Sequence, residues 1–219
     1  MNQMPALTRD RIVAAAIDLI EREGADAISM RRIAADLGVG VMSLYNHLPN
    51  KAALLDAVAQ RVLSQITFTD DPEAEWTERV RIQARAFRQI AHHYPHSTMV
   101  VVSRQLQSPA GLMPVERALD TLREAGFEGE DAVQILRTFI AYIIGALLRE
   151  VGVTPTYAPG SHGELGVPRV DPALFPAVDS VAPLLGAWDH EEAFEYGLDL
   201  LITAVAARLK QVGEKSARG

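Results

Sequence analysis

The chain has 219 residues, 48% of them hydrophobic, with a formal net charge of −7 and no cysteine, so it can form a core but neither disulfides nor thiolate metal sites. Its longest charge-free apolar run, residues 138–148, is shorter than the roughly twenty residues of a membrane-spanning helix, and no basic start followed by an apolar segment marks a secretory signal. We therefore expect a cytoplasmic protein that does not cross a membrane.

The first predicted elements are three helices near the amino end. Thr8 can cap a helix that Gly24 ends, and Ser29 can cap a second one. Gly38 and Gly40 bracket the turn that follows. Glycine accepts the left-handed backbone conformation at little cost, so the chain can reverse there within a few residues. A short third helix over residues 41–48 completes a helix-turn-helix.

The third helix is predicted to have one buried and one exposed face. Leu44 and Leu48 share a side at i and i+4 and would hold the helix to the body. The outward side then carries small, hydroxyl, amide and imidazole groups, which suit base edges and phosphates better than a core. Its members are Met42, Ser43, Tyr45, Asn46 and His47. Residues 27–51 also have a local charge of +2 in an acidic chain, which predicts salt-sensitive binding through a few phosphate contacts.

The remaining elements are also predicted to be helical, so the fold class is all-α. Asn50 can cap a fourth helix that runs to about residue 66. Pro95 should end the fifth helix, which is predicted over residues 76–92. Residues 152–186 contain six prolines and five glycines, and we assign them no regular element. Helical spacing predicts additional helices over residues 97–106, 114–125, 130–151 and 190–212.

Residues 37–58, LGVGVMSLYNHLPNKAALLDAV, resemble the DNA-binding end of the tetracycline-repressor (TetR) family of bacterial transcription regulators, with its LYxHxxNKxxLLD signature. The resemblance is strong over about residues 7–66 and weaker to the end of the chain. It implies a DNA-binding domain over 1–51, a connecting helix over 52–66 and a ligand-binding and dimerisation domain over 67–219. A homodimeric repressor that a small apolar effector releases from a palindromic double-stranded DNA operator is the function it implies.

The resemblance also assigns roles to residues of the helix-turn-helix. Tyr45 and Lys51 are expected to contact phosphates, and Arg31 to reach a base or a phosphate, although a solvated charged face is the alternative for Arg31 and its neighbour Arg32. An apolar side chain in the major groove can still touch a thymine methyl group. The full set of predicted DNA contacts is Arg31, Val41, Met42, Ser43, Tyr45, Asn46, His47 and Lys51.

Helical regulators of this kind enclose an apolar cavity, and aromatic or flexible residues on three predicted helices are candidates for lining it. These are Phe87, Met99, Phe139, Tyr142 and Ile143, and Gln83, Arg104 and Gln105 could orient a ligand. For each apolar residue taken singly, an ordinary core position is the alternative. Ala141, Gly145, Ala146 and Gly197 are small enough for close helix packing. The resemblance implies that the two helices that carry them form a four-helix dimer interface.

We expect neither a metal, nor a cofactor, nor catalysis. Pro95 lies between His92 and His96 and removes the shared helix face that a metal site would need. The founding tetracycline repressor holds a magnesium-bound drug partly through two histidines, and their places are Val100 and Ala141 here. No GxxxxGK, GxSxG or HExxH motif is present. Two rival functions stay open: an enzyme or carrier that keeps the helix-turn-helix as a packing unit, and an adaptor that docks a protein.

Overall fold

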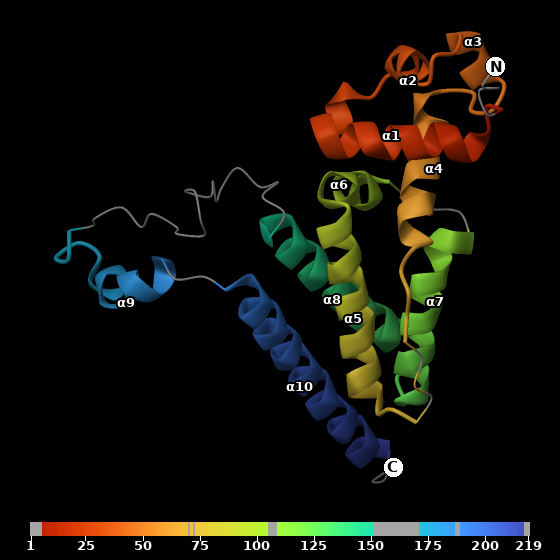
Figure 1. Ribbon diagram of the computed structural model, residues 1–219. Coiled ribbons are helices and arrows are strands. Elements are labelled where there is room, and N and C mark those ends of the chain that lie inside the picture. Colours follow the sequence, from red (N-terminus) through yellow and green to blue (C-terminus); the bar gives the residue numbers. More distant parts are fainter. Residues whose placement is uncertain are drawn as a thin grey trace. The chain divides into compact units, whose positions relative to one another are not determined.

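The structure, a computed structural model, describes residues 6–69, 71, 73–104, 109–150, 171–186 and 189–216 (Figure 1). Those residues form ten α-helices and one 3-10 helix and contain no strand, which confirms the all-α class. The chain divides into two compact units, residues 1–125 and 126–219. Each unit is described by itself.

The amino-terminal helices of the first unit are set by local capping. Helix α1 spans Arg9–Glu23, the 3-10 helix η1 spans Ala25–Ala27, α2 spans Met30–Asp36, α3 spans Val41–Tyr45 and α4 spans Lys51–Leu63. All three predicted caps are confirmed, because side-chain oxygens of Thr8, Ser29 and Asn50 accept hydrogen bonds from backbone N–H groups at 3.2, 3.2 and 2.8 Å. Helix α3 is shorter than the predicted 41–48 and ends in a turn.

The reversal between α2 and α3 depends on one glycine rather than two. Gly38 has φ +67°, in the left-handed region that a residue with a Cβ rarely adopts. Gly40 has φ −69° and caps α3 in an extended conformation that any residue can take. The prediction that both glycines supply unusual backbone freedom is therefore right only for Gly38.

One hydrophobic core joins these helices to a later one. Fully buried side chains come from all four α-helices of the amino-terminal set, among them Ile12 of α1, Ile33 of α2, Leu44 of α3 and Val58 of α4. Val100, which follows in sequence about forty residues after α4, belongs to the same cluster. The core that supports the helix-turn-helix therefore extends beyond the predicted boundary at residue 66.

Three further helices complete the first unit: α5 spans Trp76–His93, α6 spans Pro95–Ser103 and α7 spans Pro109–Glu124. Pro95 ends α5 as predicted and also opens α6, where its missing N–H costs nothing. Helix α7 begins five residues before the predicted start, with Pro114 inside it. Helices α5 and α7 pack together through an ion pair of Arg79 with Glu124 and a hydrogen bond of Gln83 with Thr121.

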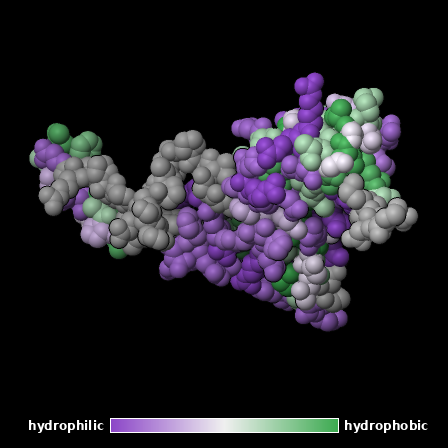
Figure 2. All heavy atoms as spheres, turned by 45° about the horizontal axis from the view of Figure 1, so that its top comes forward, coloured by the Kyte–Doolittle hydropathy of each residue, from purple (hydrophilic) through white to green (hydrophobic). Residues whose placement is uncertain are grey.

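The second unit contains α8, Gly129–Glu150, α9, Pro176–Gly186, and α10, His190–Ser216. Helix α9 corrects the assignment of residues 152–186 as irregular over its own residues, and residues 152–170 lie outside the described part of the chain. Its first proline, Pro176, sits at the start of the helix, where proline is tolerated, and Pro183 lies inside it. Figure 2 shows hydrophobic atoms exposed at the far left, where α9 lies, and Leu174 and Leu184 are each 72% exposed.

Helix α8 is long and apolar enough to cross a membrane when judged by length and composition alone. The same test is passed by core helices of globular proteins. Helix α8 packs against α10, with an ion pair between Asp131 and Arg208 and with the ring of Tyr142 lying 5.9 Å from that of Phe194. These contacts identify α8 as a packing helix of the second unit.

Candidate nucleic-acid interface and effector region

Helix α3 has the predicted buried and exposed faces. Leu44 and Leu48 are 0% and 3% exposed and fix the helix to the core. Met42 is 69% exposed and Tyr45 is 41% exposed. Asn46 and His47 are exposed as well, whereas Val41 and Ser43 are half-buried. The helix thus presents a mixed face of thioether, phenol, amide and imidazole groups to solvent.

Two adjacent arginines of α2 have opposite surroundings. The Arg32 guanidinium donates to Glu23 Oε1 at 2.8 Å and to Asp36 Oδ1 at 3.3 Å, so its charge is neutralised within the protein. Arg31 is exposed, and no residue in the described part of the chain forms a hydrogen bond or ion pair with it. Lys51, at the start of α4, is exposed too. Of these cations, Arg31 and Lys51 are therefore available to an external anion, and Arg32 serves the fold.

Helix α6 is tied at its first turn to α1. The Glu21 carboxylate accepts backbone N–H groups of His96 at 3.2 Å and Ser97 at 2.8 Å. These N–H groups belong to the first turn of α6 and have no partner within their own helix. A carboxylate at this position also interacts favourably with the positive end of the helix dipole.

At its other end, α6 is tied to α4. Arg104 donates from Nε to Asp56 Oδ1 at 2.7 Å and from an Nη to the Ala52 carbonyl at 3.0 Å. Arg104 was predicted to orient a ligand, and the structure instead gives its guanidinium a positioning role on α4. Sequence reasoning missed Glu21, Asp56 and their contacts. Gln105, another predicted ligand contact, lies outside the described residues.

An aromatic and polar cluster occupies the space between α5, α7 and the segment that follows α4. The rings of Phe68 and Phe87 meet edge to face at 6.5 Å, and the Arg117 guanidinium lies 5.0 Å from the centre of the Phe68 ring. Nearby, Gln83 Nε2 donates to Thr121 Oγ1 at 2.9 Å. Gln83 and Phe87 are predicted site residues, whereas sequence reasoning missed Phe68, which lies in an acidic segment without helical spacing.

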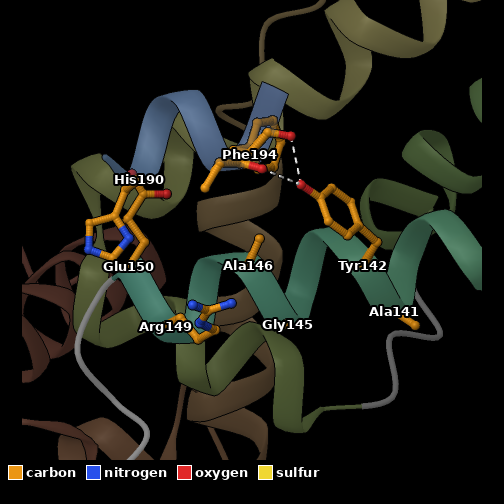
Figure 3. Close-up of a pocket in the computed structure, with 9 residues that line it drawn as sticks. Ala141, Tyr142, Gly145, Ala146, Arg149, Glu150, His190 and Phe194 are labelled. Carbon is orange, nitrogen blue, oxygen red and sulfur yellow. Dashed lines mark hydrogen bonds between the residues drawn. The ribbon is translucent and has the colours of Figure 1, made fainter. Parts of the chain in front are cut away.

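Tyr142, predicted to contact a ligand, is a tie between α8 and α10 (Figure 3). Its hydroxyl donates to the Phe194 carbonyl at 2.6 Å and lies 3.2 Å from that of Ala193. Burial raises the pKa of Tyr142 above its ordinary value. Gly197 makes room for this ring, since a Cβ there would lie 2.4 Å from Tyr142 Oη. Gly197, predicted to allow close helix packing, thus does so by admitting a side chain.

A cavity of about 340 Å³ lies beside this tie, between α8 and α10. Small residues make much of its wall, and Arg149, Glu150 and His190 lie at one end (Figure 3). Phe139, also predicted to contact a ligand, is 6% exposed and belongs to the core of this unit, and Ile143 is half-buried. Met99, on α6, is half-buried as well.

The two histidines considered for a metal site, His92 and His96, lie on different helices. His92 is in the last turn of α5 and His96 in the first turn of α6, where His96 Nδ1 lies 2.9 Å from the Glu21 carbonyl oxygen. Within the described residues, no group of three or more histidine or acidic side chains is placed to hold a metal ion.

Comparisons with known proteins match both parts of the chain. Residues 12–58 match the model of the tetR family of bacterial regulatory proteins, and residues 68–209 match the tetracyclin repressor-like C-terminal domain. The tetracycline repressor protein class A from transposon 1721 of Escherichia coli is 30% identical over 94% of this chain and 93% of its own length.

Two further relatives come from Streptomyces. The transcriptional repressor DrrR1 of Streptomyces coeruleorubidus is 33% identical over 65% of this chain, and the match spans about half, 53%, of that protein. The structure of ActR from Streptomyces coelicolor in complex with actinorhodin is 28% identical, covers 93% of this chain and 99% of its own, and has a TM-score of 0.80.

Proposed function

Because the chain belongs to the TetR family and is a ligand-responsive, DNA-binding transcriptional regulator, we propose that it represses transcription from a palindromic operator and is released by a small apolar molecule. The observation that carries the proposal is the exposed polar face of α3 beside the exposed Arg31. Such a face can enter a major groove while the leucines behind it stay in the core.

The proposed DNA contacts divide by chemistry. Arg31, Tyr45 and Lys51 offer charged or hydroxyl donors, which suit phosphate oxygens, and Arg31 can also reach the acceptor edge of guanine. The remaining side chains of the face, with Val41 at its margin, are proposed to lie along base edges and the adjoining backbone: Val41, Met42, Ser43, Asn46 and His47.

We also propose that the functional form is a homodimer. The second unit exposes large apolar side chains on both of its long helices: Val133 and Ile140 on α8, seven residues apart, and Tyr196 and Leu200 on α10, four residues apart, are 36–68% exposed. Each pair follows helical spacing and so forms a stripe. Four such stripes from two copies can bury one another in a four-helix interface. This interface would hold the helix-turn-helix of each copy in place for one of two successive major grooves.

The effector site is proposed to be built around the Phe68–Phe87 pair, with the Gln83 amide and the Thr121 hydroxyl as orienting groups. Aromatic surface with a few polar groups is typical of sites for planar organic molecules. ActR, a neighbour of this chain, holds actinorhodin, which supports an organic ligand of this kind. Met99 and Gln105, which belong to the same unit, stay in the proposal as further contacts. Phe139 and Ile143 belong to the second unit and are proposed separately as candidate ligand contacts there. Val100 and Ala141 stand here at the two positions where the founding tetracycline repressor carries histidines, so we propose a ligand that needs no magnesium.

An effector must change operator affinity to act. Coupling free energies of about 1–3 kcal/mol are common and would lower operator affinity about 5- to 150-fold. The ties at both ends of α6 connect this helix with α1 and α4, which support the helix-turn-helix. We therefore propose α6 and α4 together as the coupling elements.

The proposal is tested by DNA-binding titrations at several salt concentrations, with duplexes enriched by the protein from a random pool. Each phosphate neutralised contributes about 0.9 to the slope of log affinity against log salt, so a clearly negative slope is expected. A flat response, or an Arg31→Ala/Tyr45→Phe double variant that binds as tightly as the parent, would contradict the assignment.

The rival functions are not favoured. The named relatives are transcriptional regulators and repressors, which implies a non-enzymatic role for this chain, in the cytoplasm where such regulators act. Turnover of a small molecule without any retardation of DNA would support an enzyme or carrier instead. An adaptor role would require that a protein partner on α3 is not displaced by bulk DNA at low salt.

A further inference from the structure

The first turn of α3 projects one long side chain into solvent. Gly40, the N-cap, has no side chain. Val41 is half-buried and packs against the amino-terminal core, and Ser43 is half-buried as well. Met42 lies between them and is 69% exposed, the most exposed large apolar residue of the helix-turn-helix. Any contact that this turn makes with a base edge is therefore made chiefly by Met42.

Methionine has little to offer a polar partner. Its thioether sulfur is a weak acceptor, and it has no donor at all. The other exposed groups of this surface, those of Arg31, Tyr45, Asn46 and His47, are all able to form strong hydrogen bonds. A single exposed apolar residue is ordinary on a protein surface, but at this position it restricts what the helix can recognise.

The major groove exposes one alkyl group, the methyl on C5 of thymine; the other groups that distinguish one base pair from another there are hydrogen-bond donors and acceptors. We infer that Met42 is a specificity-determining residue that selects a pyrimidine with a C5 methyl group. A methionine over a guanine, adenine or unmodified cytosine edge would remove water from a polar group without replacing its hydrogen bond, which is unfavourable. Cytosine methylated at C5 presents its methyl at the same place as thymine, so the inference extends to methylated DNA.

This inference rests on the proposed DNA-reading role of α3 and deepens it. The expected size of the effect follows from the apolar surface that one methyl group buries against Met42. Burial of one methylene-sized group contributes about 0.8 kcal/mol, which corresponds to about fourfold in affinity. Removal of the methyl from both half-sites of a palindrome should then weaken binding by about sixteenfold if the half-sites act independently.

The test begins with selection of duplexes from a random pool by the parent protein and by Met42→Ala. The parent should enrich a position that is thymine in nearly every duplex, and Met42→Ala should lose the preference at that position only. The thymine is then replaced by deoxyuridine, which lacks the methyl and keeps the base-pairing edge. Parent binding should weaken about fourfold per half-site, whereas binding by Met42→Ala should not change.

Two additional binding measurements make the test more specific. At the same position, 5-methylcytosine should bind the parent more tightly than cytosine. Met42→Gln, which carries an amide that can bond both N6 and N7 of adenine, should shift the selected base towards adenine. Met113→Ala is the matched control: Met113 is 52% exposed on α7, so its truncation removes a similar side chain and should leave the selected sequence unchanged.

The outcomes separate the inference from the function on which it rests. Deoxyuridine that weakens the parent and Met42→Ala equally, or neither of them, would overturn the role of Met42 while leaving DNA recognition by α3 intact. Equal selection of the same thymine by both proteins would overturn it as well. A parent protein that enriches no duplex at all would contradict the DNA-reading proposal and the inference together.

Discussion

Arg31 and Arg32 are neighbours in sequence with different tasks. Arg32 is bonded to Glu23 and Asp36, and Arg31 has no partner in the described residues. We expect Arg31→Ala to weaken operator binding by about 1–3 kcal/mol and to leave the free energy of unfolding within about 0.5 kcal/mol of the parent. Fluorescence anisotropy with a labelled duplex and urea unfolding measure the two effects.

Arg32→Ala is the control with the same change in charge. It removes exposed ion pairs, which are worth about 0–1 kcal/mol each, so its effect should appear in stability at least as much as in DNA affinity. If the two variants lost the same operator affinity at unchanged stability, the distinction between a DNA-reading and a structural arginine would be wrong.

Gly197 on α10 gives a second prediction at the residue scale. Gly197→Ala would place a Cβ 2.4 Å from the Tyr142 hydroxyl, which two carbonyl oxygens hold in place. We expect a loss of about 1–3 kcal/mol in the free energy of unfolding, as is typical of overpacking. Truncation of Tyr142 in the same chain should recover part of it, so the double variant should lose less than the two single variants together.

Gly145→Ala is the matched substitution on α8. Its Cβ would meet no atom of the described residues within 4 Å, and alanine is favoured over glycine in a helix by up to about 1 kcal/mol. Gly145→Ala should therefore be neutral or stabilising in chemical unfolding of the dilute protein. Equal losses for both alanine variants would show that a feature shared by the two sites, such as a subunit contact, and not the Tyr142 ring, explains the glycine.

At the scale of elements, α6 is expected to depend on a cap supplied by another helix. Glu21→Gln removes the negative charge from the group that accepts two N–H bonds of the first turn of α6. We expect a loss of about 1–2 kcal/mol in the free energy of unfolding, because charge-assisted hydrogen bonds are stronger than neutral ones. Asp18→Asn provides the comparison on the same helix, since Asp18 is exposed; its effect should stay below about 0.5 kcal/mol.

These elements also show what the sequence could and could not predict. The caps Thr8, Ser29 and Asn50 were predictable because a cap and the N–H it accepts are three residues apart. The bonds of Glu21 and Arg104 were not, because their partners are 76 and 48 residues away. A sequence pattern shows that such residues are polar but does not show what they face.

Sequence patterns did not predict α9 or the contact of Phe68, for related reasons. Prolines in residues 152–186 suggested an irregular segment, although two of them lie within α9. The aromatic contact of Phe68 with Phe87 joins a loop to a helix, and no periodicity in the sequence connects the two. The outward side of α3 could be predicted more fully, because the buried Leu44 and Leu48 fix which side of this short helix faces solvent.

At the scale of the whole molecule, operator binding is expected to depend on pairing of two copies. Leu200 is 55% exposed and Tyr196 is 68% exposed on α10, and a stripe of this kind is stable in water only if it is small or covered. We predict that Tyr196→Glu/Leu200→Glu converts a dimer into a monomer, because two charges would be buried in the interface without partners. Sedimentation at several concentrations measures the change.

The same variant should bind one half-site but lose most of the affinity for a full palindrome. A dimer contacts both half-sites at the cost of one association, so its affinity exceeds that of a single head by several orders of magnitude when the spacing fits. The free monomer should stay folded, because both substituted side chains are exposed in the single chain. Leu112→Glu on α7, where Leu112 is 53% exposed, adds a charge to a helix that is not part of the predicted interface and should leave a dimer. If the α10 variant stayed dimeric with full operator affinity, subunit pairing would have to use another surface.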